Sequence, residues 1–421
     1  MKILFKLAFS LLLITLLIVL IHINKALYYQ PTIQTIEGST INLDILHQLN
    51  FLKTTLHQGA GSDMQGLYPE GFIFMHALYG LSWCELATPL NKHTKLYKQA
   101  MEEIAWSLAQ IDSEEGKQPF TQNLLPAYGA FYAGWSNYLL GKKLVLTDNA
   151  FRDSTEVRKF TEQCLQIAEA IRKTDNPYPE SYSNAAWPAD GVICIASLAL
   201  YDQMYPYTFA PTIQHWLEKA KTHLDPATGL IPHSVQAQTG TTREGARGSS
   251  QSLINSFLPD IDPVFARQQF DQYKNLFLTE RVGIPAIREY PKGKEGEADI
   301  DSGPVIWDIG GAATIVAIKT MNQYGEQQTA QAIRGGLEGF GFPVNSADTK
   351  QYLFGQLLIA DAFIAWVSLE PLSKHPIQPA TKLSPKWRLP FQLISLILMV
   401  LSLDCLVYLW KRRSESQLRA I

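Results

Sequence analysis

Several motifs that would assign a biochemical class directly are missing from this 421-residue sequence. It contains neither G-x-G-x-x-G nor G-x-x-x-x-G-K-[ST], so it lacks the glycine-rich loops that bind dinucleotides or nucleotide phosphates. The G-x-S-x-G turn of the commonest serine hydrolases is also absent. We therefore expect chemistry that needs neither a nucleotide cofactor nor a serine nucleophile of that type.

Metal-binding patterns are scarce as well. Asp299 and Asp301 form a two-carboxylate pair, but the further ligands and the glycine of a calcium loop do not follow them. No pair of histidines has the spacing of a zinc site. The sequence predicts an activity without a metal or any other cofactor.

Neither sign of charge is in excess, and cysteine is rare. The chain carries 36 Lys and Arg against 39 Asp and Glu, a formal charge of -3, so nothing indicates a nucleic-acid partner. Cys405 falls in an apolar run, while Cys84, Cys164 and Cys194 fall in apolar helical patterns without a C-x-x-C motif. We interpret these three as small buried hydrophobic residues rather than a disulfide framework.

Long apolar runs are present at both ends of the chain. Ile3–Ile23 and Leu389–Trp410 are each about as long as the 20 residues that span a bilayer. Basic residues begin the first run and follow the second, so the positive-inside rule places both termini in the cytoplasm. A cleaved signal peptide is the alternative for the first run, but its core is long and no Ala-x-Ala site follows.

This topology divides the chain into four parts. They are an anchor (residues 1–25), a domain outside the cytoplasm (26–386), a second transmembrane helix (387–413) and a cytoplasmic tail (414–421). We predict a two-pass protein of the inner (cytoplasmic) membrane whose main, periplasmic domain lies beyond the lipid bilayer.

One acidic residue is unusual in its position. Asp404 interrupts the second apolar run, and a carboxylate facing lipid is costly. It could pair with Lys6, which enters from the same side, or with a membrane partner. Reaching nearby headgroup water is an equally good explanation.

Between the two apolar runs, two kinds of helical segment alternate. Runs rich in glycine, alanine and aromatic residues, almost without charge, begin near Pro69, Pro126, Pro188, Gly248, Pro304 and Gly355. Amphipathic segments lie between them, and another precedes the first. Helices that are apolar on all sides are buried and those with one polar face lie outside, so we expect six inner and six outer helices.

Six helical hairpins predict an all-α fold, an (α/α)6 toroid, with an open solenoid as the alternative. Two loops rich in Gly, Pro and Asp, 225–248 and 282–304, are expected to form short β-hairpin excursions.

In such a ring all inner helices begin on one side, so the polar residues before them should converge on one funnel. These candidate residues are Tyr68, Glu70, Tyr128, Trp187, Asp190, Arg243, Glu244, Arg247, Asp299, Asp301 and Tyr352. A carboxylate at a helix start also has an ordinary use as a cap. Capping alone, however, does not explain aromatic and arginine residues beside the acids.

Two carboxylates that face each other across a funnel can divide general-acid and general-base work. Asp190 and Asp301 are our first choice as the catalytic pair, with Glu70 in reserve, and the tyrosines, Trp187 and Asp299 would bind substrate. Arg243 and Arg247 would hold a substrate carboxylate or neutralise Glu244.

Two histidines fit structural roles better than catalytic ones. His233, in a predicted hairpin, could cover the funnel mouth, but an ordinary surface histidine is the simpler expectation. His76 lies two turns into an apolar helix, where a hydrogen-bonded core histidine is expected.

Three stretches give the chain a likeness to a known family. AYGAFYAGWSNYLLG, then SLALYDQMYPYTFAPTIQHWLEKAKTHLDPATG, then the DIDSGP loop resemble linalool dehydratase-isomerase, most clearly over residues 124–278. The resemblance implies an (α/α)6 toroid with cofactor-free acid-base chemistry on terpene alcohols. Tyr128 stands where that family has its catalytic histidine, and Ser181 and Asp190 stand near its pocket cysteines. The resemblance therefore implies the place of a pocket rather than the reaction.

We expect a membrane-anchored enzyme that acts on a carbohydrate with paired carboxylates, most simply a glycoside hydrolase. One alternative is a lyase or isomerase acting on a small hydroxylated or isoprenoid compound. A non-catalytic assembly protein of the cell envelope is another, in which the acids only cap helices and form salt bridges.

Overall fold

The computed structural model describes residues 2–205, 207–300, 302–368 and 383–418. These residues are mostly helical, with 63% in helices and only short strands. The predicted all-α class is therefore confirmed. Asp301, our first-choice partner for Asp190, lies outside the described residues.

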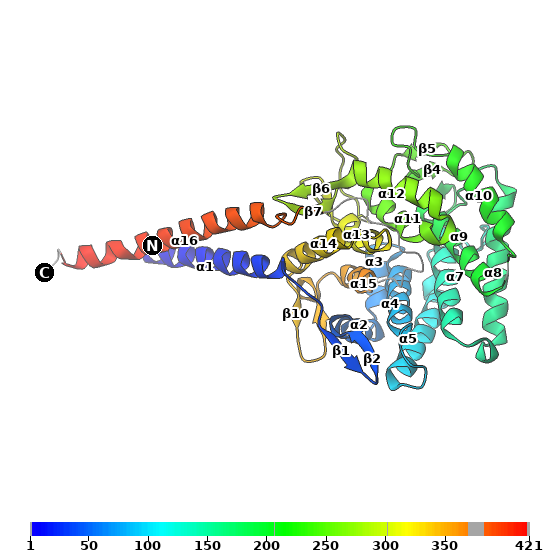
Figure 1. Ribbon diagram of the computed structural model, residues 1–421, viewed down its shortest axis with the longest axis horizontal. Helices are drawn as coiled ribbons and strands as arrows, with labels where there is room; N and C mark the ends of the chain where they lie inside the picture. The colour runs from blue at the N-terminus through cyan, green and yellow to red at the C-terminus, as the bar shows by residue number, and fades with distance from the viewer. Residues whose placement is uncertain (1, 206, 301, 369–382, 419–421) are drawn as a thin grey trace.

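Two long helices at the ends of the chain leave the main domain side by side (Figure 1). They are α1 (Lys2–Ala26) and α16 (Leu389–Leu418). Both are long and apolar enough to span a membrane, and few of their residues are buried inside the protein. The Nζ of Lys6 donates to the carbonyl of Leu409 at 2.7 Å, so among the described residues it does not pair with the exposed Asp404.

Six helices with few charged residues are largely buried, as the sequence predicts. They are α4 (Gly71–Ala87), α7 (Gly129–Leu146), α9 (Pro188–Met204), α11 (Gly248–Ile261), α13 (Gly311–Gln323) and α15 (Leu358–Val367). Each contacts the next in this order, and α15 contacts α4. We call these the inner helices.

Six amphipathic helices lie beside them, and each falls on a segment predicted to be an outer helix. They are α2 (Leu43–His57), α5 (Lys95–Ile111), α8 (Ser154–Lys173), α10 (Ala210–Thr222), α12 (Pro263–Phe277) and α14 (Gln327–Phe340). Local chemistry sets their starts: the carboxylate of Asp153 accepts hydrogen bonds from the first backbone N–H groups of α8. Two short helices lie in the connections, α3 (Ala60–Leu67) between α2 and α4 and α6 (Glu114–Lys117) between α5 and α7.

The inner helices meet through aromatic side chains. Trp135 of α7 lies 5.3 Å from Phe74 of α4, 6.0 Å from Phe257 of α11 and 6.2 Å from Trp366 of α15, between ring centroids. These pairs are near-perpendicular, a favourable geometry for aromatic rings. Lys319 of α13 reaches Glu85 of α4 at 2.7 Å, so five of the six inner helices are joined by these contacts.

The strands form small antiparallel hairpins at the ends of the helices. Those at the first predicted excursion are β4 (Ser234–Gln236) and β5 (Thr242–Glu244), which β3 (Ala185–Ala186) joins. At the second, β7 (Ile284–Ile287) pairs with β6 (Leu278–Arg281), which begins earlier than predicted, and β8 (Val305–Ile306) pairs with β9 (Ile309–Gly310). The others are β1 (Ile33–Ile36) with β2 (Ser39–Asn42), and β10 (Val344–Asn345) with β11 (Lys350–Gln351).

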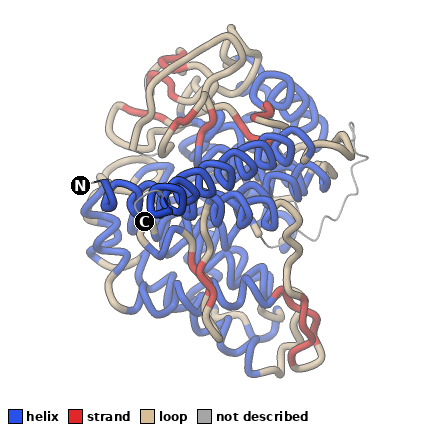
Figure 2. The backbone as a smooth tube through the Cα atoms, turned by 90° about the vertical axis from the view of Figure 1, so that its left-hand side faces the viewer, coloured by secondary structure: helices blue, strands red, loops and turns tan. Residues whose placement is uncertain are grey.

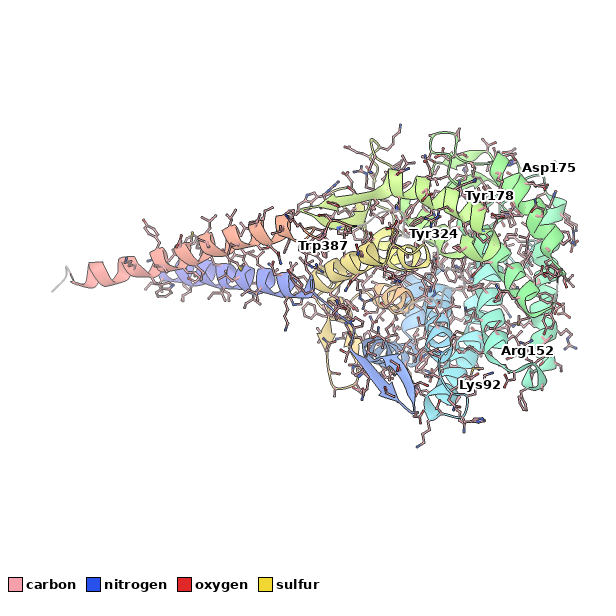
Figure 3. All side chains as sticks on the ribbon, in the orientation of Figure 1. Lys92, Arg152, Asp175, Tyr178, Tyr324 and Trp387 are labelled. Atoms are coloured by element: carbon pink, nitrogen blue, oxygen red, sulfur yellow. The ribbon has the colours of Figure 1, made fainter. Side chains whose placement is uncertain are left out.

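The side of the domain from which α1 and α16 depart carries several of these hairpins and loops (Figure 2). The opposite side is formed by α8 and α10, and Asp175 and Arg152 lie on this side (Figure 3). The domain thus has one face next to the terminal helices and one far from them.

Candidate functional site

A loop between α8 and α9 bonds two predicted acids through adjacent residues. The hydroxyl of Tyr182 donates to the carboxylate of Glu70, which precedes α4. The hydroxyl of Ser181 donates to Asp190 of α9 at 2.6 Å, and it accepts the backbone N–H of Trp187 at 3.2 Å. Glu70 and Asp190, 120 positions apart in the chain, are therefore connected through adjacent residues of this loop.

The loop is held against the start of α7 by a close backbone approach. The N–H of Ala130 donates to the carbonyl of Glu180 at 2.8 Å. Gly129 has a φ of +84°, and a Cβ there would lie 2.1 Å from the carbonyl oxygen of Ser181. Only glycine fits this position, so the sequence of α7 fixes where Ser181 and Tyr182 stand.

Aromatic rings surround Tyr182, the residue that bonds Glu70. The ring of Tyr182 stacks near Phe120 at 5.9 Å and stands perpendicular to Trp187 at 5.5 Å. Phe131 lies 6.5 Å from Tyr182 and 4.9 Å from Phe74, both between ring centroids. Asp190 is buried, whereas Glu70, Tyr182 and Trp187 are half-buried and so remain partly open to solvent.

Two tyrosines that were predicted as site residues at these helix starts are also half-buried. Tyr128 directly precedes α7 with a left-handed φ of 65°, and its ring contacts Tyr132 at 5.1 Å. Tyr68 lies two residues before Glu70 and packs against the hydrophobic core. Both belong to the same end of the inner helices as Glu70 and Asp190.

Arg247 organises a second group at the start of α11. Its guanidinium binds the buried Glu289 at 2.9 Å, Ser302 at 2.7 Å, and Asp299. Burial raises the pKa of Glu289, although bonds from Ser249 and the charge of Arg247 oppose this. Burial would also raise the pKa of Asp299, but hydrogen bonds from Ser302 and Arg247 lower it on balance. Arg247 thus already has carboxylate partners within the chain.

His233 and its neighbours lie beside this second group. The side chain of His233 is only 15% exposed, so it is not the surface histidine that the sequence suggested. It contacts Ser250 through Nδ1 and Glu244 through Nε2, the latter at 3.4 Å. Burial, together with the charge of Arg247, lowers its pKa to about 4. Arg243, predicted to bind substrate, is exposed on β5.

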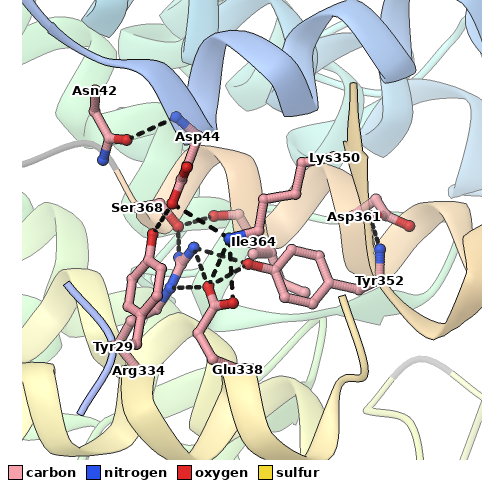
Figure 4. Close-up of polar contacts among 10 residues, drawn as sticks. All are labelled: Tyr29, Asn42, Asp44, Arg334, Glu338, Lys350, Tyr352, Asp361, Ile364 and Ser368. Carbon is pink, nitrogen blue, oxygen red and sulfur yellow. Dashed lines mark hydrogen bonds and ion pairs between the residues drawn. The ribbon is translucent and has the colours of Figure 1, made fainter. Parts of the chain in front are cut away.

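Tyr352 belongs to a third hydrogen-bonded group, drawn in Figure 4, which includes neither Glu70 nor Asp190. Its hydroxyl donates to Glu338 at 2.6 Å and accepts from Arg334 at 2.9 Å. Lys350 binds Glu338 at 3.0 Å and also approaches Asp44 of α2. These side chains are nearly all buried, and they pair two cations with two anions.

Sequence reasoning overlooked one buried acid at the same end of the inner helices. Asp361, in the first turn of α15, is 1% exposed, and its Oδ1 accepts the backbone N–H of Tyr352 at 2.7 Å. Its Oδ2 has no partner among the described residues. Burial raises its pKa to about 7. The signal was an acid inside the apolar run LIADAFIAWV.

The two described cavities lie near outer helices, and no predicted site residue lines them. One, of about 210 Å³, lies between α5, α7 and α8. The other, of about 280 Å³, is bordered by His57, Trp106, Glu115 and His76. His76 is buried, and its Nδ1 bonds the carbonyl of Phe72 at 2.8 Å, which agrees with a core histidine.

Cysteines and potential metal ligands give little further chemistry. Cys84, Cys164 and Cys194 are buried free thiols, as predicted. Within the described ranges, no three His, Cys, Asp or Glu side chains are grouped so as to hold a metal ion. No family model and no curated protein matches this chain.

Proposed function

We propose that this chain is a membrane-anchored (α/α)6 toroid with its active site where the inner helices begin. The contacts that run from α4 through α15 and back to α4 support a closed ring rather than an open solenoid. The two apolar terminal helices support a two-pass topology, with the main domain outside the cytoplasm and both termini inside. The likeness to linalool dehydratase-isomerases is part of this proposal.

The reaction we propose is hydrolysis of a glycoside by paired carboxyl groups. One observation carries it: Glu70 and Asp190 are hydrogen-bonded to the adjacent loop residues Tyr182 and Ser181, and the ring of Tyr182 packs against that of Trp187. Aromatic faces suit the apolar faces of sugar rings, and the half-buried carboxyl of Glu70 can bind their hydroxyl groups. Pairs of carboxyl groups are the catalytic residues of most glycoside hydrolases.

The hydrogen bonds suggest how the work is divided. Asp190 accepts a hydrogen bond from the hydroxyl of Ser181, and we assign it the role of the general base that takes a proton from water. The leaving oxygen then needs a proton donor, for which Glu70 and Asp301 are the candidates. Breaking the glycosidic C–O bond with one water and one transferred proton requires no cofactor.

A second function is favoured by the aromatic surroundings of Tyr182. Phe120 and Phe131 lie beside its ring and Phe74 packs on Phe131, and apolar rings of this kind also suit an isoprenoid or other apolar alcohol. The same acid and base would then remove or move a hydroxyl group, as a lyase or isomerase. A non-catalytic envelope protein, in which these acids serve only the fold, is the remaining alternative.

The test is an activity screen of the full chain in lipid nanodiscs against glycans and small terpene alcohols. We expect release of reducing sugar, and a 10²- to 10⁴-fold loss of turnover in Asp190→Asn, the range for losing a general base. Asp175→Asn, an exposed acid on the far face, is the matched control. Turnover of terpene alcohols alone would favour the lyase. Equal activity in both variants, with unchanged melting temperatures, would refute a catalytic role for Asp190.

A further inference from the structure

Several large apolar side chains are exposed on the face of the domain next to α1 and α16. Trp307 is 74% exposed, Phe354 65% and Phe340 52%. We define the membrane-side patch as Val282, Ile306, Trp307, Phe340, Leu353 and Phe354. Exposed apolar groups of this size, gathered on one face, indicate an interaction surface.

One half of the membrane-side patch is attached to the terminal helices through the end of α14. The ring of Phe340 lies 6.3 Å from that of Phe391 in α16. Phe342, two residues on, stacks on His22 of α1 at 5.4 Å. The N–H of Leu353 donates to the carbonyl of Gly341 at 2.8 Å, which holds Leu353 and Phe354 beside this end of α14.

The other half is attached through the turn between β6 and β7. A Cβ on Gly283 would lie only 2.1 Å from the carbonyl oxygen of Trp387, the residue two before α16. Arg281, on the same hairpin, donates from Nε to the carbonyl of Trp307 at 3.1 Å. In Figure 1 the hairpin of β6 and β7 and the end of α14 both lie on the side from which α1 and α16 leave.

The backbone of this face is strained at the apolar residues it exposes. Val282, Trp307, Leu353 and Phe354 have left-handed φ values of 53°, 50°, 48° and 57°. Bulky side chains rarely adopt this region, because their Cβ crowds the following carbonyl. Strained turns that hold apolar side chains away from the core are typical of functional positions.

Aromatic and basic residues mark the level of the membrane surface at the same place. The guanidinium of Arg388 lies 4.5 Å from the ring centre of Tyr28 and 4.2 Å from that of Trp387. Tyr and Trp gather at the boundary between lipid and water, and arginine there can meet phosphate headgroups. The membrane-side patch adjoins this belt, because Gly283, the residue after Val282, lies against the carbonyl of Trp387.

We propose that the membrane-side patch inserts into the outer surface of the lipid bilayer, so that the domain lies against the membrane. The proposal rests on the membrane anchoring proposed above. The occupant is lipid because the patch is continuous with the two helices that would enter the bilayer. The apolar side chains on the strained loops would then leave water and lie at the boundary between headgroups and acyl chains, as in membrane-surface anchors.

The experiment uses a fluorescent probe that a lipid-borne quencher can reach. In a chain with Cys405→Ser, the remaining cysteines are buried, so Phe354→Cys or Trp307→Cys introduces one reactive thiol. Each variant is labelled with NBD and placed in phosphatidylcholine nanodiscs with or without nitroxide-labelled acyl chains. The control is Phe151→Cys, whose side chain is 81% exposed on the far face, beside Arg152. A second sample, labelled at the native Cys405, reports whether α16 is in lipid.

We expect the probes at positions 354 and 307 to lose at least three-fold more fluorescence than the probe at 151. Equal quenching at 354, 307 and 151, with strong quenching at Cys405, would overturn the membrane-side patch and leave the anchoring intact. No quenching at Cys405 would overturn the anchoring, and the patch with it. Circular dichroism of each labelled variant checks that the fold is kept. A probe that is shielded from water but not quenched would indicate a protein partner and overturn the assignment to lipid.

Discussion

Replacing Asp361 by Asn should change how the stability of the protein depends on pH. The carboxyl is buried on α15, and its pKa is raised from 3.8 to about 7 because burial disfavours the charged form. Between these two values the folded protein keeps a proton that the unfolded chain has released. Its contribution to stability is therefore fully present below about pH 4 and is lost as pH rises through 7.

The size of the effect follows from this shift. One pKa unit corresponds to about 1.4 kcal/mol, so the shift of roughly three units is worth about 4 kcal/mol in total. Between pH 5 and pH 8 the wild-type protein should lose about 2.5 kcal/mol of this, whereas Asp361→Asn removes the titration. The amide keeps an oxygen for the N–H of Tyr352 but leaves its own N–H groups without an acceptor, a cost of about 1–3 kcal/mol at either pH.

The measurement is urea unfolding of the full chain in detergent micelles, followed by circular dichroism at pH 5 and pH 8. We expect the free energy of unfolding of Asp361→Asn, relative to wild type, to rise by about 2.5 kcal/mol between the two pH values. The exposed Asp175→Asn should show no such change. If the difference between Asp361→Asn and wild type is the same at both pH values within about 0.5 kcal/mol, the carboxyl is not buried as described.

Two further predictions concern charges elsewhere. Lys350→Met removes a cation from the buried group in Figure 4 and should lower the free energy of unfolding by about 3–5 kcal/mol. Replacing the exposed Lys173 by Met should lower it by under about 1 kcal/mol. Equal melting temperatures of the two variants would contradict this prediction. Asp404→Ala should leave the amount of membrane-bound protein unchanged, because Lys6 binds the carbonyl of Leu409; a large drop in membrane fractions would instead indicate a partner for Asp404.

Helix order and type could be predicted from the sequence because burial is periodic. The run from Gly71 to Ala87 is apolar on all sides and is buried, whereas the run from Ser154 to Lys173 has one polar face and lies outside. The predicted start of the second hairpin, residue 282, was too late, because the strand Leu278–Arg281 follows α12 directly and continues its apolar face. Pairing with β7, a tertiary contact, decides where that helix ends.

The candidate site could be predicted only in part. Glu70 and Asp190 were singled out by their positions before the inner helices, but Tyr182 and Ser181, which connect them, carry no helix-start signal. Asp361 was overlooked because the candidate site residues were the polar residues that precede each inner helix, whereas Asp361 lies inside one, in the first turn of α15. These side-chain partnerships depend on how distant segments approach, which local patterns do not encode.

The place of the active site is the central claim, and a ligand-bound structure of Asp190→Asn tests it most directly. With a glycan from the activity screen bound, we predict a sugar ring beside Trp187, with the carboxyl of Glu70 within about 9.5 Å of the side chain at position 190, the limit for paired hydrolytic carboxyls. A glycan bound in either cavity near the outer helices, or a separation above about 12 Å, would contradict the account.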